Sequence, residues 1–233
     1  MKKYKLTNET IVYFGITLYR IEALMDFSDV KTGDKGGFVQ SENNLSQLGN
    51  AWVYGNAKVC GDAKVCGDAK VCGDAWVYGN AKVCGNAKVC GNAKVCGDAW
   101  VYGKAEVYDN AEVYGNAKVY GNAKVCGDAK VCGNAKVCGN AKVCGDADAY
   151  GKAEVRGDAK VYKNSDYIVF KNWWSSGRYF TWTRSNNMWK VGCFYGNGEE
   201  LIKKAYADSE ESGREYERVV RYVENILADE LNK

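Results

Sequence analysis

The chain has 233 residues, of which 46% are hydrophobic, and its 32 basic and 29 acidic side chains give a formal net charge of +3. This balance provides no strong field for binding nucleic acid or an anionic membrane, and no apolar run approaches the roughly 20 residues that span a bilayer. The sequence contains no proline, which suits a chain of hydrogen-bonded strands, and no histidine, which removes the commonest general base and metal ligand.

Residues 1–50 combine short strand patterns with a turn-rich stretch. Ile11–Phe14 and Thr17–Ile21 are rich in β-branched and aromatic residues, and turn-forming residues follow at 31–37. The apolar positions between Phe38 and Leu45 then lead into the next segment. The pattern predicts an N-terminal β cap that ends in a first coil.

Residues 51–164 read as 19 consecutive hexads of the form A-x-V-x-G-[N/D], with few departures. Ala and Val stand two residues apart, so in an extended segment both point to one face, while the residue between them points to the other. The Gly-Asn or Gly-Asp pair tolerates the positive φ that a sharp corner needs. Each hexad is therefore predicted to be a short strand with an apolar inner face, followed by a corner.

Three such corners close the chain into a triangular coil of three hexads, or 18 residues. Coils stacked at the inter-strand spacing of about 4.8 Å pair their backbone groups in parallel ladders. The hexads therefore predict an all-β solenoid whose interior is filled by Ala and Val. Open ends would expose strand edges and apolar surface, so we expect both ends to be capped.

The slots on either side of Val vary in a way that predicts their position. The slot after Val holds mostly Cys or Tyr, and the slot before it holds mostly Lys, Glu or Trp. A close-packed interior does not exchange a thiol for a phenol ring, so both slots are predicted to lie outside the solenoid or at its corners. Trp52, Trp76 and Trp100 recur at 24-residue intervals, or four hexads, so they fall on successive faces and form no single stripe.

Ten cysteines occupy the slot after Val, and stacking places residues 18 apart above one another. The superposed pairs are Cys66 with Cys84, Cys72 with Cys90, and Cys126 with Cys144. Their Cα distances suit a disulfide, but Cβ vectors of parallel strands do not converge and no secretory context is evident. We expect structural thiols, with disulfides and metal or redox chemistry as the alternatives. The lack of C-x-x-C spacing argues against a metal site.

Residues 165–233 carry no hexads and are densely aromatic. The stretches IVFKNWW, RYFTWTR and MWKVGCFYGNG predict three strands separated by turns. Two helices follow, at about 199–209 and 214–231, with a break at Gly213. The second has apolar residues on one face at helical spacing, so this segment is predicted to be an α+β module.

The aromatic and arginine residues of this module are the candidate binding site. Rings interleaved with arginine could stack on and pair with a nucleotide-like ligand or a protein partner. The alternative is that the rings form the core of the module and cover the last coil. The candidates are Trp173, Trp174, Arg178, Tyr179, Trp182, Arg184 and Trp189. Cys193 is expected to be a packed thiol, because the chain has no histidine to activate it.

Three resemblances extend these predictions. The Ala and Val slots resemble the hexapeptide-repeat family, whose fold is the left-handed parallel β-helix. The left-handed winding is implied by this resemblance alone, because the general rule for parallel crossovers favours the right hand. The stretches KYKLTNE, LYRIEALMDFSDVKTGDKGGFV and LSQLGNAWVYGNA resemble the YdcK-like proteins of enteric bacteria, which carry only a nominal transferase label. The stretch CFYGNGEE resembles C-terminal modules of phage and prophage proteins of unknown function.

The resemblance to hexapeptide-repeat proteins implies two enzymatic comparisons. Characterised acyltransferases and carbonic anhydrases of this fold depend on histidine and on loops extruded from the helix, whereas this chain has no histidine and no insertion within 51–164. We therefore expect no enzymatic activity, no catalytic residue, no cofactor and no metal. A histidine-free acyltransferase relative and a purely structural spacer or self-assembling protein are the alternatives.

The sequence thus predicts an N-terminal cap at 1–50, a left-handed β-helix at 51–164 and a C-terminal α+β module at 165–233. We expect a non-enzymatic scaffold, phage- or prophage-encoded, whose module binds a host protein or a small nucleotide-like ligand. A homodimer or homotrimer is a further expectation. Met1-Lys2-Lys3 leads into a polar segment instead of a signal-peptide core, which favours the cytoplasm, that of the host if the protein is phage-encoded.

Overall fold

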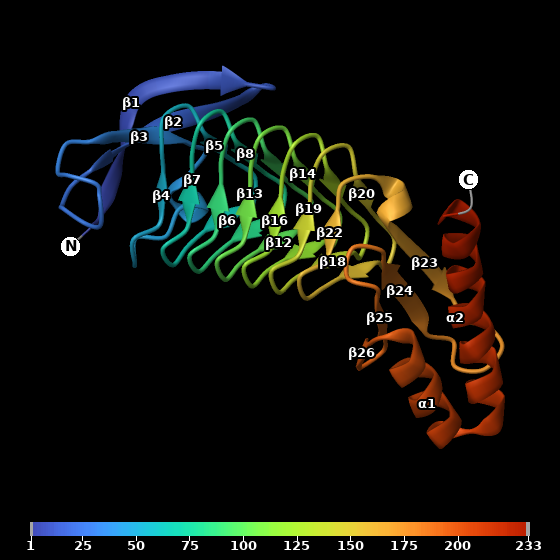
Figure 1. Cartoon of the computed structure of the whole chain (residues 1–233). Coiled ribbons are helices and arrows are strands. Elements are labelled where there is room, and N and C mark those ends of the chain that lie inside the picture. The colour runs from blue at the N-terminus through green and yellow to red at the C-terminus, as the bar shows by residue number, and fades with distance from the viewer. Residues whose placement is uncertain (1, 232–233) are drawn as a thin grey trace. The chain divides into compact units, whose positions relative to one another are not determined.

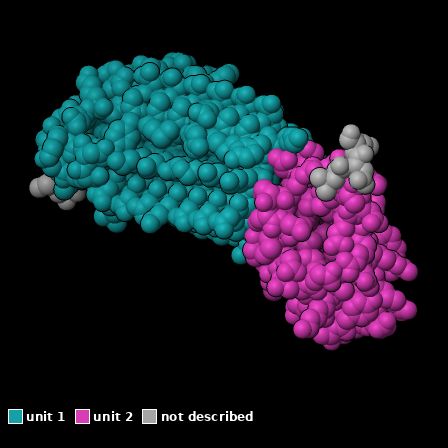
Figure 2. Space-filling view, viewed as in Figure 1, with its two compact units in different colours: residues 1–164 teal, residues 165–233 magenta. Residues whose placement is uncertain are grey.

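The computed structural model describes residues 2–231, and the chain divides into two compact units, Met1–Asn164 and Ser165–Lys233 (Figure 2). The first unit holds the cap and the hexads. The second holds the aromatic segment and the helices. Each unit has its own pattern of strands and its own buried residues, so we describe them separately.

The hexads form a parallel β-solenoid in which each contributes one two-residue strand (Figure 1). Strands three hexads apart pair in register, as Val59 pairs with Val77 and Val77 with Val95. The predicted 18-residue circuit is therefore confirmed, and it produces three sheets, which we call sides one, two and three. Figure 1 shows the coils as successive rungs of one stack.

Each side is one column of strands. Side one contains β3 (Lys35–Val39), β5 (Lys58–Val59), β8 (Trp76–Val77), β11 (Lys94–Val95), β14 (Glu112–Val113), β17 (Lys130–Val131) and β20 (Asp148–Ala149). Side two contains β4 (Trp52–Val53), β7 (Lys70–Val71), β10 (Lys88–Val89), β13 (Glu106–Val107), β16 (Lys124–Val125), β19 (Lys142–Val143) and β22 (Lys160–Val161). Side three contains β6 (Lys64–Val65), β9 (Lys82–Val83), β12 (Trp100–Val101), β15 (Lys118–Val119), β18 (Lys136–Val137) and β21 (Glu154–Val155).

The interior of the solenoid consists of the Ala and Val slots, as the periodicity predicts. From Ala51 to Val161 these side chains have 0% exposure. The backbone ladder runs between coils, as where the amide of Lys58 donates to the carbonyl of Ala75 at 2.9 Å. Small side chains suffice here because every strand between the two ends of a side pairs with the coils before and after it.

The corners depend on glycine and on stacked amides. Gly91 has a φ of 71°, and a Cβ at this position would lie 2.9 Å from the backbone nitrogen of Asp109 in the next coil. Asp109 adopts the same left-handed conformation, with a φ of 61°. Beside the glycines, the Asn92 side chain donates to Asn110 at 3.0 Å, and Asn110 donates to Asp128 at 2.9 Å. These ladders satisfy side-chain polar groups along the corner.

The cap extends side one beyond the first coil. Strands β1 (Tyr4–Tyr13) and β2 (Ile16–Ala23) are antiparallel, β2 is antiparallel to β3, and β3 is parallel to β5. A short 3-10 helix, η1 (Glu42–Asn44), follows β3. Predicted strands at 11–14 and 17–21 are thus present and longer than expected, and the cap and solenoid form one compact unit.

Side chains of the cap satisfy carbonyl groups of the first coils. The ammonium group of Lys3 donates to the carbonyl of Ala51 at 2.8 Å, and the Tyr4 hydroxyl donates to that of Leu45 at 2.7 Å. The Asn44 amide donates to the carbonyls of Gly61 and Ala63 at 2.8 and 3.0 Å. The predicted N-terminal cap therefore closes the solenoid with specific hydrogen bonds.

The prediction that the flanking slots lie outside is wrong at four positions: Cys138 and Cys144 are buried, and Trp52 and Cys60 are buried where the cap covers them. Trp52 is 1% exposed, because the rings of Tyr4 and Phe27 lie edge-on against it at 6.1 and 5.4 Å. Cys60 is 2% exposed and packs with Leu18 of the β1–β2 hairpin. The hexads nearest the chain start thus use an outward slot to bind the cap, which their periodicity does not reveal.

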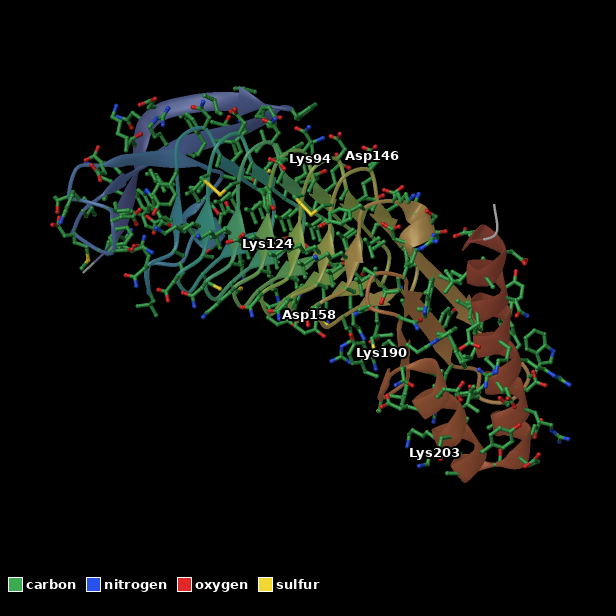
Figure 3. All side chains as sticks on the ribbon, viewed as in Figure 1. Lys94, Lys124, Asp146, Asp158, Lys190 and Lys203 are labelled. Atoms are coloured by element: carbon green, nitrogen blue, oxygen red, sulfur yellow. A yellow bond between two sulfur atoms is a disulfide. The ribbon has the colours of Figure 1, made fainter. Side chains whose placement is uncertain are left out.

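The cysteine ladder also corrects the sequence prediction. Cys72–Cys90 and Cys126–Cys144 are disulfides on side two, with Cα–Cα distances of 4.6 and 4.5 Å (Figure 3). The parallel Cβ vectors argued against such bonds, but at this spacing rotation about the Cα–Cβ bond brings the two sulfur atoms together. Seven cysteines are free, including both members of the third stacked pair and Cys193, which is exposed and not packed as predicted.

The second unit is an antiparallel sheet with two helices on one face. A 3-10 turn, η2 (Asn164–Asp166), leads into β23 (Tyr167–Lys171), β24 (Tyr179–Thr183), β25 (Met188–Val191) and β26 (Phe194–Gly196), which pair in this order. Helices α1 (Gly198–Asp208) and α2 (Glu210–Leu231) follow. This is the predicted α+β module, but the third predicted strand is split, because Gly192 forms a turn with a φ of 55°.

The predicted helix break lies elsewhere. Ser209 is extended, with a φ of −170°, and separates α1 from α2, whereas Gly213 lies inside α2. A Cβ on Gly213 would lie 2.2 Å from the ring of Tyr206, so glycine is required here because the two helices approach closely. The predicted break thus mistook a helix-packing glycine for a helix terminator.

Candidate functional site

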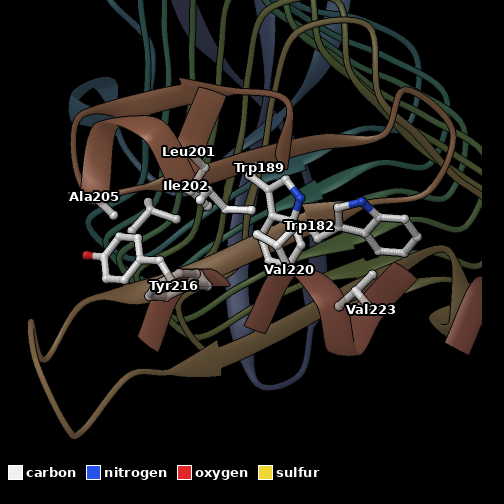
Figure 4. Close-up of a cluster of buried hydrophobic side chains, with 10 residues drawn as sticks. Trp182, Trp189, Leu201, Ile202, Ala205, Tyr216, Val220 and Val223 are labelled. Carbon is white, nitrogen blue, oxygen red and sulfur yellow. The ribbon is translucent and has the colours of Figure 1, made fainter. Parts of the chain in front are cut away.

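Two of the predicted site residues are core residues of the second unit. Trp182 and Trp189 are each 2% exposed and lie between the sheet and the helices (Figure 4). Phe180 anchors the same cluster, with its ring edge-on to Tyr216 of α2 at 4.7 Å. The alternative interpretation from sequence, that rings form the core of the module, therefore holds for these two tryptophans.

The two remaining tryptophans lie on the loop between β23 and β24. Trp173 and Trp174 are 73% and 72% exposed, in contrast to the strand that their sequence context predicted. Large apolar side chains are rarely exposed together unless they bind something. This loop is therefore the candidate binding site of the module.

A buried asparagine holds the loop in shape. Asn172 is 1% exposed, and its side-chain oxygen accepts hydrogen bonds from the amides of Trp174 and Ser175 at 2.9 and 3.2 Å. Its backbone amide donates to the carbonyl of Arg178 at 2.9 Å, which closes the loop. The exposed rings are thus presented by a preorganised turn, which lowers the entropy lost on binding.

A groove of about 480 Å³ lies beside this loop, between β23 and α2. The strand contributes Ile168 and Phe170, and the loop contributes Trp174. Four residues of one face of α2 complete it, namely Glu215, Arg218, Val219 and Tyr222. Tyr222 is 65% exposed, so the groove has one exposed ring on each wall and an apolar floor.

The charged side chains at the groove and beside it already have partners. The Arg218 guanidinium donates to Glu215 at 2.6 Å, one turn away on α2. Lys171 lies 3.6 Å from the ring centre of Trp173, a cation–π contact that occupies one face of that ring. The groove is therefore apolar in its centre, with a neutralised ion pair on its rim.

The other predicted residues do not meet at this groove. Arg184 is paired with Glu230 of α2, and the Arg178 side chain lies beside Gly192, within 3.2 Å of where a Cβ would be. Tyr179 is half-buried, and because side chains alternate along β24 it lies on the face opposite Phe180. Of the seven predicted residues, only Trp174 lines the groove.

Sequence reasoning missed the helical wall of the groove. Arg218 and Tyr222 are four residues apart, so they share a face of α2 that lies next to its apolar face. An exposed tyrosine on that face was a usable signal. Its pairing with Ile168 and Phe170 depends on how α2 crosses the sheet, which the local pattern does not determine.

The solenoid carries a second hollow, which is polar. It has a volume of about 570 Å³ and is lined by corner and outward residues of successive coils, among them Lys94 and Asp146 (Figure 3). Lys94 donates to Glu112 at 3.0 Å, so its charges are partly paired. Among residues 2–231, no group of three or more His, Cys, Asp or Glu side chains is placed to hold a metal ion.

A search of the described helices finds none that is both long and apolar enough to cross a membrane. The longest, α2, has charged residues throughout its outer face, including Arg221, which contacts both Glu199 and Glu224. Buried residues of both helices pack with those of the sheet in one cluster.

Comparison with known proteins gives one informative similarity. No protein-family model matches the chain. A protein of Escherichia coli (strain K12), named "Uncharacterized acetyltransferase YdcK", is 36% identical over 62 residues, which is 23% of this chain and 19% of that relative. The match thus spans about a fifth of the relative's length. Together with the 18-residue circuit, it supports a hexapeptide-repeat β-helix and a distant similarity to this acetyltransferase-named protein.

Proposed function

We propose that the protein is a non-enzymatic scaffold in which the β-solenoid carries an interaction module, and that the groove between β23 and α2 is its binding surface. The observation that carries this proposal is the pair of exposed rings, Trp174 and Tyr222, on either wall of an apolar groove. Tryptophan and tyrosine in such positions are typical hot spots of protein interfaces.

The occupant we propose is an extended apolar segment of a partner protein. In the described residues β23 pairs only with β24, so its other edge is the border of the sheet. A segment added there would form backbone hydrogen bonds with β23 and direct alternate side chains toward Ile168 and Phe170. Arg218 is neutralised by Glu215, which favours an apolar partner over the nucleotide-like ligand that the sequence suggested.

A peptide-library selection on the full chain tests this proposal. We expect enriched peptides with apolar residues at alternate positions. The double variant Trp174→Ala/Tyr222→Ala should weaken their binding by tenfold or more, or about 1.4 kcal/mol. Both side chains are largely exposed, so the variant should retain the circular dichroism spectrum and the thermal midpoint of the parent.

Trp100→Ala is the matched control, because Trp100 is an exposed tryptophan of the solenoid with 40% exposure. It should leave peptide binding unchanged. Binding that survives the double variant would contradict the proposal, as would a selection that enriches no peptide. Sedimentation measures whether a second copy fills the groove. An oligomer that dissociates in the double variant would mean that the occupant is a second copy of this chain and not a partner segment.

An acyltransferase activity is the second candidate, supported by the similarity to the E. coli protein. The absence of histidine from the chain weighs against it, because the family's known chemistry uses that residue. Calorimetry with acetyl-CoA distinguishes the two: micromolar binding would favour the acyltransferase. A phage or prophage origin, a host partner, a cytoplasmic location and a homo-oligomeric state remain predictions from the sequence.

A further inference from the structure

The hexad cysteines fall into two groups according to the residue one coil away. Three pairs place cysteine directly against cysteine, at a sequence separation of 18. Two of these pairs are the disulfides of side two, whereas Cys66 and Cys84 on side three are both thiols. The four other hexad thiols have tyrosine, arginine or glutamine as coil neighbours, and they are Cys60, Cys96, Cys132 and Cys138.

The strands that carry the thiol pair are hydrogen-bonded to each other as in the two disulfides. The amide of Cys66 donates to the carbonyl of Val83 at 3.0 Å, as the amide of Cys72 donates to Val89 at 2.9 Å. The two disulfides have Cα–Cα distances of 4.6 and 4.5 Å, and the strands that carry them remain paired. A bond at this slot is therefore compatible with the coil spacing.

The two sulfur atoms are also close. The Sγ atoms of Cys66 and Cys84 are 2.8 Å apart, and both side chains are half-buried. A disulfide bond is about 2.05 Å long, so the sulfur atoms need to move by less than about 1 Å. Solvent reaches both residues, which gives a small oxidant access to them.

We propose that Cys66 and Cys84 form an oxidation site for low-molecular-weight disulfides, with glutathione disulfide as the representative oxidant, and that the product is a third disulfide between coils. The Cys66 thiolate attacks one sulfur of glutathione disulfide, which forms a mixed disulfide and releases one glutathione thiolate. Cys84 then loses its proton and attacks the Cys66 sulfur, which releases the second glutathione. Two protein thiols are oxidised and one glutathione disulfide is reduced to two thiols.

The order of the two steps follows from the surroundings of Cys84. Burial and the hydrogen bond with Cys66 raise the pKa of Cys84 to about 12, so it is almost fully protonated at neutral pH. The thiolate is the attacking species, so Cys84 is a poor first nucleophile. In the mixed disulfide its partner sulfur is already in place, and the attack becomes intramolecular.

Oxidation would add a covalent link between two coils that are otherwise joined by non-covalent contacts. The existing disulfides both lie on side two, and the third would tie two successive coils on side three. A cross-link restricts the unfolded chain, so the oxidised protein should have a higher thermal midpoint. The site would therefore set the stability of the first coils by the thiol–disulfide balance around the protein.

Intact-mass counting of free thiols tests the proposal. Tryptic peptides do not suffice, because residues 59–64 and 65–70 have the identical sequence VCGDAK. The full chain has seven free cysteines, and Cys193→Ser removes the exposed one, leaving six. This variant is treated anaerobically with glutathione disulfide, denatured in acid and alkylated.

We expect the number of alkylated thiols to fall from six to four, with no glutathione adduct and a higher thermal midpoint. Adding Cys66→Ser should abolish both effects. Adding Cys84→Ser should abolish the cross-link and the higher midpoint, with at most one thiol lost, as a glutathione adduct on Cys66. Cys96→Ser, which removes a thiol with no sulfur neighbour, should still lose two. Because Cys66→Ser and Cys84→Ser are tested separately, the test still stands if one of them misfolds. A parent that keeps six thiols, or a Cys84→Ser chain that still loses two, would overturn the proposal.

Discussion

At the residue scale, the corners of the solenoid make the strictest demand on side-chain identity. Gly91 and Asp109 occupy the same corner slot in successive coils, and both are left-handed. We expect Gly91→Ala to lower the free energy of unfolding by more than about 1 kcal/mol, because left-handed backbone is costly with a Cβ. The added Cβ would also press on the backbone of Asp109.

Asp109→Gly is the reverse change at the same slot. It removes the strain of the left-handed residue but adds unfolded-state entropy and loses the bond from the amide of Gly127 to the carboxylate at 3.1 Å. The net change should be within about 0.5 kcal/mol. Urea unfolding curves check both variants, and equal losses of stability in the two would refute this account of the corner.

The titration of buried groups predicts how stability depends on pH. Burial raises the pKa of Cys60, Cys84 and Cys96. An unfolded thiol titrates near 8.5, so the stability from these groups is fully present below about pH 8.5 and is lost as pH rises toward the folded values. Lys3 has the opposite sign: burial lowers its pKa to about 8, so its deprotonation adds stability between about pH 8 and 10.4.

Three thiols have raised pKa values and one lysine has a lowered pKa, so we expect a net loss of stability above about pH 8.5. Anaerobic urea unfolding between about pH 7.5 and 10 measures it. The triple variant Cys60→Ala/Cys84→Ala/Cys96→Ala should show a flatter or rising profile, whereas Cys193→Ser, which removes an exposed thiol, should match the parent. A profile unchanged by the triple substitution would count against this assignment.

At the element scale, α1 begins with a reciprocal pair of hydrogen bonds. The Asn197 side chain accepts from the amide of Glu200 at 2.9 Å, and the Glu200 carboxylate accepts from the amide of Asn197 at 3.0 Å. Asn197→Ala should lower the stability of the second unit by about 1 kcal/mol. Glu200→Gln keeps an acceptor and should have a smaller effect.

Circular dichroism at the helical band checks this prediction, because the helices of the described chain all lie in the second unit apart from short 3-10 turns. The helical signal of Asn197→Ala should melt at a lower temperature than that of the parent. An unchanged melting curve would mean that packing against the sheet, and not the hydrogen bonds of Asn197, determines where α1 starts.

The sequence predicted the hexad elements well because each requires a particular residue. The residue type alone identifies these positions: glycine at a left-handed corner, and Ala and Val at the buried slots. Trp52 and Cys60 were misassigned because their burial depends on the cap, a contact made by distant residues. The state of each cysteine pair depends on side-chain rotation, which periodicity does not encode.

The candidate site was predicted only in part for the same reason. Trp173 and Trp174 were selected by their residue type, and their exposure came from the turn that Asn172 organises. Trp182 has the same residue type but lies in the core. The groove itself combines β23 with a distant face of α2, and only the fold brings Phe170 and Tyr222 together.

At the scale of the whole molecule, the two units are built in different ways. The solenoid fills its interior with Ala and Val, and its coils are joined by continuous backbone ladders, corner amides and disulfides. The second unit has a mixed aromatic core and presents its exposed rings on a loop. Repeated coils suit a structural role, while preorganised exposed aromatics suit recognition.

Hydrogen exchange of the full chain with and without a library-selected peptide tests the central proposal most directly. We predict added protection in β23, in the loop at 172–178 and in the segment of α2 at 215–222, with the already slow amides of the solenoid unchanged. Protection confined to the solenoid, or none in β23, would contradict the proposal that this groove is the binding surface.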